Sequence, residues 1–261
     1  MHHKNIKIFI SALAGLVLFL APITQAIEIS PVAAAATDSS CQFQDFAKAL
    51  TETTKNPSED YGEAVRAELK VRRDWLKAVL NCSVFETKKL QVALREFQTQ
   101  DADLDKLRVQ LLNQLEDVFQ YYDLQLSRVD DHGLRSTKDA AQAIRDWRNG
   151  THSVIAERAG NLMLWSKNQE LITAARTRYE LIGQTIRRLN LMDEEEIRDK
   201  YSESEKTLVR AEQLNSSARV LLLQSANSDT TKTIKESLEN LSQTYERFFE
   251  LSEDIKQLLP I

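Results

Sequence analysis

Glycine and proline are scarce in this chain of 261 residues, which contains 6 glycines and 4 prolines. Pro57 is the only proline that lies away from the two ends of the sequence. No segment shows a sustained alternation of β-branched and polar residues, so nothing in the sequence predicts a sheet. A long chain with few helix breakers, rich in Ala, Leu, Glu, Lys, Gln and Arg, is predicted to be all-α.

Sequence motifs for catalysis and cofactor binding are also missing. The chain has no glycine-rich phosphate loop, no Cys-x-x-Cys, no Glu-x-x-His and no Gly-x-Ser-x-Gly. These absences exclude the common signatures of nucleotide binding, dithiol redox chemistry, di-iron bundles and serine hydrolases. We therefore predict a protein that is not an enzyme and that uses no cofactor and no metal.

The chain contains only two cysteines, Cys41 and Cys82. In an exported protein, two cysteines most simply pair with each other. We predict a Cys41–Cys82 disulfide, which chain-entropy arguments value at about 4 kcal/mol. Two unrelated buried thiols are the alternative.

The N-terminus has the organisation of a targeting segment. Lys4 and Lys7 precede an uncharged, mostly apolar run over residues 8–23, and small residues follow at the positions that a signal peptidase recognises. We predict a cleaved signal peptide over residues 1–26. The alternative is a retained anchor, but a helix of 16 residues reaches only about 24 Å, short of a hydrocarbon core of roughly 30 Å.

The mature protein is then expected to be exported, with a periplasmic, cell-surface or extracellular location and no stable membrane span. Residues 27–40 show no periodicity and are predicted to be a flexible leader. Removal of Lys4 and Lys7 with the signal peptide lowers the formal net charge from −5 to −7. This negative charge argues against nucleic acid as a partner.

Apolar residues recur at helical spacing through the rest of the chain. The ranges predicted to be helical are 41–55, 57–80, 84–129, 136–189, 193–226 and a last helix after residues 227–229. The third of these has a weak spot near Gln100-Asp101. Asn56 is expected to cap the second helix, and Ser83-x-x-Glu86 is read as a capping box for the third. Because short connections force neighbouring helices to be antiparallel, we predict an elongated up-and-down antiparallel bundle with long coiled-coil-like helices over residues 41–261.

The last helix has the most regular pattern of the chain. Its apolar positions alternate steps of three and four residues: Ile234, Leu238, Leu241, Tyr245, Phe248, Ser252, Ile255 and Leu259. We expect this seam to pack inside the chain's own bundle. Association of two copies of the protein through the last helix is the alternative.

The densest group of ligand-capable side chains lies near Asn149-Gly150-Thr151, where the fourth helix is expected to kink or split. This group comprises Arg145, Trp147, Arg148 and His152. Two guanidinium groups beside an indole and an imidazole are suited to binding an anion or a small ligand. The commoner arrangement is a core tryptophan flanked by solvated charges.

Four Asn-x-Ser/Thr triplets begin at Asn81, Asn149, Asn215 and Asn240. They accept a glycan only in a host with the glycosylation machinery, so unmodified asparagines are expected.

The sequence predicts an exported helical protein that is structural or that binds a protein partner through helix faces. The alternative function is an extracytoplasmic module that binds or senses a small ligand or anion.

Overall fold

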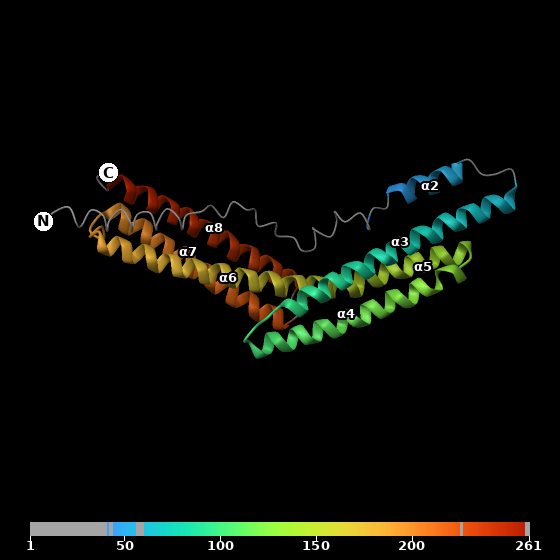
Figure 1. Ribbon diagram of the computed structural model, residues 1–261, viewed down its shortest axis with the longest axis horizontal. Helices are drawn as coiled ribbons and strands as arrows, with labels where there is room; N and C mark the ends of the chain where they lie inside the picture. The colour runs from blue at the N-terminus through green and yellow to red at the C-terminus, as the bar shows by residue number, and fades with distance from the viewer. Residues whose placement is uncertain (1–40, 42–43, 56–59, 225–226, 259–261) are drawn as a thin grey trace. The chain divides into compact units, whose positions relative to one another are not determined.

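The computed structural model of the chain describes residue 41 and residues 44–55, 60–224 and 227–258. These residues form helices that pack against one another and contain no strand (Figure 1). The predicted all-α bundle is therefore confirmed, whereas its elongated, coiled-coil-like character stays a prediction. The predicted signal peptide, the predicted leader and the Asn56-Pro57 helix start lie outside the described residues.

Contacts between residues divide the chain into two compact units. The first unit contains α2 (Gln44–Lys55), α3 (Tyr61–Glu96), α4 (Ala102–Arg128), α5 (Leu134–Trp147) and residues 153–171 of α6 (Ser153–Arg188). Residues 211–238 of α7 (Glu195–Gln224) and α8 (Asn227–Leu258) complete this unit. The second unit contains the described parts of residues 172–210 and 239–258. A single bundle domain over residues 41–261 stays a prediction.

Helix α3 runs straight through the boundary that was predicted at Ser83. Its first turn is capped by Asp60, whose carboxylate accepts hydrogen bonds from two backbone N–H groups. Ser83 instead donates its hydroxyl proton to the Val79 carbonyl oxygen, 3.0 Å away within the same helix. The predicted capping box is wrong, because a serine can satisfy its hydroxyl on the preceding turn without ending the helix.

The predicted helix over residues 84–129 is interrupted at its expected weak spot near Gln100-Asp101, because the chain turns between Glu96 and Ala102. Asp101 caps α4 there by accepting hydrogen bonds from backbone N–H groups of its first turn. Helices α3 and α4 are antiparallel. The Gln91 amide bonds to Glu116 in the middle of α4, while Lys77, earlier on α3, pairs with Asp130, 2.7 Å away, beyond the C-terminal end of α4.

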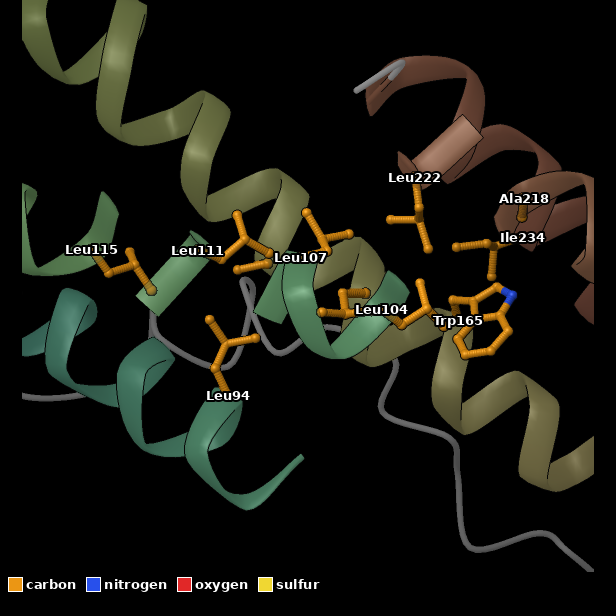
Figure 2. Packing of buried hydrophobic residues seen from close by; sticks show 11 residues of the cluster. Leu94, Leu104, Leu107, Leu111, Leu115, Trp165, Ala218, Leu222 and Ile234 are labelled. Carbon is orange, nitrogen blue, oxygen red and sulfur yellow. The ribbon is translucent and has the colours of Figure 1, made fainter. Parts of the chain in front are cut away.

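The core of the first unit joins residues from five helices (Figure 2). It contains Leu94 of α3, a leucine line on α4, Trp165 with its neighbours on α6, and residues from the ends of α7 and α8. The leucine line is Leu104, Leu107, Leu111 and Leu115, at the helical spacing seen in the sequence. Because it places each leucine on one face of α4, this spacing lets α4 bury a continuous apolar stripe.

Helix α7 is antiparallel to both α6 and α8. Within the first unit, Asn161 bonds to the Asn227 carbonyl oxygen and Asn168 bonds to Ser237, so α6 and α8 are parallel. Asn168 also bonds to Asn215 of α7. In the second unit the Arg178 guanidinium of α6 lies over the Tyr245 ring of α8, while Lys200 of α7 pairs with Asp254 of α8.

The seam of α8 differs from the predicted one along one of its two lines. Ile234, Leu241, Phe248 and Ile255 are buried as expected. The second buried line contains Thr230, Ser237, Thr244 and Leu251. Of the residues predicted for this line, Ser252 is buried, Leu238 and Tyr245 are only half-buried, and Leu259 lies outside the described residues. The prediction missed this line because small hydroxyl side chains carry no apolar signal.

None of the described helices has the length and apolar character needed to cross a membrane.

Candidate functional site

A π-helical turn, η4 (Arg148–His152), separates α5 from α6. The backbone N–H of Ser153 donates to the Arg148 carbonyl oxygen, five residues earlier, and this wider turn accommodates one extra residue. The predicted kink at Asn149-Gly150-Thr151 therefore takes the form of a π-bulge. Such bulges occur frequently at functional sites, which makes this turn the candidate site of the first unit.

His152 is buried at the end of this turn and is 3% exposed. Its Nδ1 lies 2.9 Å from the hydroxyl oxygen of Tyr122 on α4, while its buried Nε2 has no hydrogen-bond partner. Burial, followed by the nearby Arg148 charge, lowers the pKa of His152 to about 4. The imidazole is consequently neutral at physiological pH.

Tyr122 is fully buried and anchors the turn to α4. Burial is the main reason that the pKa of the Tyr122 hydroxyl is raised to about 12. Its ring meets Trp147 edge to face, with ring centroids 5.3 Å apart, and meets His152 in the same manner at 5.4 Å. The hydroxyl therefore remains protonated and available for the hydrogen bond to His152.

Arg148 ties the turn to α3. Its guanidinium donates to the Ser83 hydroxyl oxygen and to the Glu86 carboxylate, each at 2.6 Å. The Arg148 and Glu86 side chains are 34% and 22% exposed, so the pair is only partly screened by water. Two of the donor groups of this arginine are thus engaged within the protein.

The predicted disulfide is present between Cys41 and Cys82, whose Cα atoms are 5.3 Å apart. Cys82 is buried on α3, so the bond attaches the chain segment before α2 to the body of α3. Glu86 lies beside it, and the three residues form a group of possible metal ligands. Both sulfur atoms are consumed by the disulfide, so this group offers no thiolate to a metal.

The structure brings together three of the four side chains that the sequence singled out. Trp147 stacks on Tyr121 with ring centroids 3.7 Å apart, and Arg148 and His152 belong to the same turn. Arg145 is exposed and bonds instead to Gln142 of its own helix. Binding of an anion or small ligand here stays a prediction.

Sequence reasoning missed the partners of this turn on α3 and α4. Tyr122 falls on the helical spacing of apolar residues in α4, and this spacing gives no sign of the contact with His152. Ser83 and Glu86 were assigned to a capping box. Each partner is distant in sequence from the turn, so only the packing of α3 and α4 against it reveals the network.

The four glycosylation triplets differ in accessibility. Asn215 is completely buried, and its side-chain amide bonds to Asn168 and Gln169. Asn81 and Asn149 are exposed, while Asn240 is half-buried. A glycan on Asn215 is incompatible with this fold, because the side chain has no access to solvent.

The second unit presents an exposed aromatic side chain on α8. Phe249 is 58% exposed, although its neighbour Phe248 is 1% exposed. Leu181 of α6 is also exposed, at 44%.

No family model, curated protein or solved structure matches this chain. Inferences about its function therefore rest on the placement of its own residues.

Proposed function

We propose that this protein is an exported helical module without catalytic activity that binds a protein partner through a helix face. The Cys41–Cys82 disulfide supports export, because disulfides persist in oxidising compartments and are rare in reducing ones. The predicted signal peptide over residues 1–26 supports the same location. A periplasmic, cell-surface or extracellular site of action is therefore part of the proposal.

The observation that carries the proposed interaction is the exposure of Phe249 on α8. The parallel helices α6 and α8 are in contact where Arg178 covers the Tyr245 ring, 5.2 Å from its centroid. Leu181 lies one turn beyond Arg178 on α6, and Phe249 lies one turn beyond Tyr245 on α8. Both side chains therefore lie along the line of contact between α6 and α8. We call Leu181, Tyr245 and Phe249 the apolar face.

A half-buried tyrosine beside an exposed phenylalanine and leucine has the composition of an interface centre. Aromatic residues are enriched at the centres of protein interfaces, and charged residues surround them. Arg247 and Glu250 form such a charged pair next to Phe249 on α8, 2.7 Å apart. The occupant that fits this face is an apolar helix of another protein, laid along the α6–α8 seam.

Capture of a partner from the native compartment tests the proposed function. Phe249→Ser is compared with Leu124→Ser, which removes another exposed apolar side chain from α4. Loss of an aromatic anchor costs about 2 kcal/mol or more, so Phe249→Ser should weaken partner binding roughly 30-fold. Equal binding by the parent and Phe249→Ser proteins would exclude the apolar face as the interface.

A further inference from the structure

The surroundings of His152 favour its neutral state. In either neutral tautomer, one hydrogen bond joins Nδ1 to the Tyr122 hydroxyl, and Nε2 is left without a partner. An imidazolium carries a proton on both nitrogens. Its Nε2–H would then be a buried, charged donor without an acceptor, which is among the costliest arrangements in a protein interior.

The groups that face His152 make its positive charge less favourable still. Arg148, in the same turn, is already cationic, and its charge opposes protonation of the imidazole. From α4, Tyr122 is in contact with His152 and Tyr121 lies beside Tyr122; burial raises the pKa of both hydroxyls, so both remain uncharged at neutral pH. Glu86 of α3 carries the nearby negative charge, but its carboxylate is bonded to Arg148.

We propose that the π-helical turn is an acid-operated joint, in which proton uptake by His152 breaks its contact with Tyr122 and releases the turn from α4. The proton comes from solvent and is carried by the imidazole, which then moves to reach water. The turn is suited to this movement because a π-bulge contains one residue more per turn than the α-helices that flank it. Gly150, at its centre, has open space around it.

In keeping with this geometry, burial and the Arg148 charge lower the pKa of His152 to about 4. The joint consequently stays closed at neutral pH and opens only in acid. The aromatic contacts of Trp147 with Tyr121 and Tyr122 are expected to change when it opens. The proposed movement involves α3, α4 and the turn, and it requires no partner at the apolar face.

Nuclear magnetic resonance of the purified protein between pH 7 and pH 3.5 tests this joint. The imidazole carbon–proton signal of His152 reports its protonation, and the indole N–H signal of Trp147 reports the turn. We expect His152 to titrate well below the ordinary histidine value of about 6.5. Trp147 should change with the same midpoint, while Trp165, which donates to the Asn215 carbonyl oxygen elsewhere in the first unit, should not.

Titration of His152 near 6.5 would overturn the proposal, as would titration of His152 with no change at Trp147. A His152→Phe variant distinguishes the effect of protonating the imidazole from that of protonating the carboxylates, because the phenylalanine side chain cannot take up a proton. The acid-dependent change at Trp147 should disappear in this variant. Its persistence would assign the movement to another group, such as Glu86, and would refute the role of His152.

Discussion

The Ser237 hydroxyl of α8 donates a hydrogen bond to the Ala211 carbonyl oxygen of α7, across an oxygen–oxygen distance of 2.7 Å. A bond from a short side chain to the backbone of a neighbouring helix requires the two helices to approach closely. Both residues are completely buried. Ala218 and Thr230, one heptad away on each helix, are buried as well. Small residues on facing lines thus allow α7 and α8 to pack tightly.

Enlarging one of these small residues should destabilise the bundle. Ala211→Leu adds three carbon atoms where the α7 backbone is bonded to Ser237, and overpacking of this kind costs about 1–3 kcal/mol. Ala174→Leu is the matched control, because Ala174 is exposed on α6 and its replacement should change stability by less than about 0.5 kcal/mol. Urea denaturation of the two variants measures the difference. Equal midpoints would contradict the close approach of α7 and α8.

Two glycines should respond oppositely to alanine. A Cβ at Gly183 would overlap the hydroxyl of Tyr201, whose ring is held in place by stacking on Tyr179 at 4.4 Å. Gly183→Ala should therefore destabilise the protein by about 1–3 kcal/mol. Gly150 has nothing within 4 Å of its Cβ position, so Gly150→Ala should stabilise it by about 0.4–1 kcal/mol. Thermal melting compares both variants, and a more stable Gly183→Ala protein would refute this packing.

Stability should fall in acid because of His152. Its pKa is about 4 in the folded protein, against an ordinary value of about 6.5 when unfolded. The unfolded chain binds this proton more tightly, so the contribution is fully present above pH 6.5 and is lost as the pH falls towards 4. The loss over this window amounts to about 3 kcal/mol. Denaturation midpoints of the parent and His152→Phe proteins, taken across this range, should differ in slope; identical slopes would contradict a buried neutral imidazole.

Removal of the disulfide should lower stability without unfolding the helices of the core. Cys82→Ala is expected to cost about 2–4 kcal/mol, since the bond restricts the unfolded chain. A free-thiol assay on the parent protein, purified without reductant, should find no thiol, and denaturation in the presence and absence of reductant should reproduce the effect of the mutation. Two titratable thiols in the native protein would show that the bond is absent.

The sequence was sufficient to predict helices, because their apolar periodicity is strong and breakers are few. Helices α5 and α7 begin at Leu134 and Glu195, each two residues from its predicted start. The boundary at Ser83 was mislocated because a Ser-x-x-Glu pattern is compatible with both a helix start and a helix interior. The boundary between α3 and α4 lies instead at the weak spot near Gln100-Asp101, where Asp101 caps α4.

The candidate site was predicted less completely than the fold. Trp147, Arg148 and His152 could be found because they are dense in sequence, near a glycine in a helix. Their partners Glu86 and Tyr122 could not, since no local pattern pairs residues that lie 62 and 30 positions away. The buried line at Ser237 and Thr244 was missed for a different reason, because buried hydroxyl groups look like surface residues in an apolar pattern.

The neighbours Phe248 and Phe249 separate the requirements of folding from those of binding. Phe248 is buried, so Phe248→Ala should cost about 3–5 kcal/mol of stability. Phe249 is exposed, so Phe249→Ala should leave stability within about 0.5 kcal/mol of the parent and weaken partner binding. Denaturation combined with partner capture distinguishes the two effects. Severe destabilisation by Phe249→Ala would mean that this side chain belongs to the core.

Photo-crosslinking from position 249 tests the proposed interaction most directly. A photoreactive phenylalanine analogue replaces Phe249 in one protein and Lys232, 77% exposed on the same helix, in another. Irradiation in the native compartment should join a protein partner to position 249 and leave position 232 unlinked. Absence of a crosslinked protein at position 249, or equal crosslinking from position 232, would contradict an interaction through the apolar face.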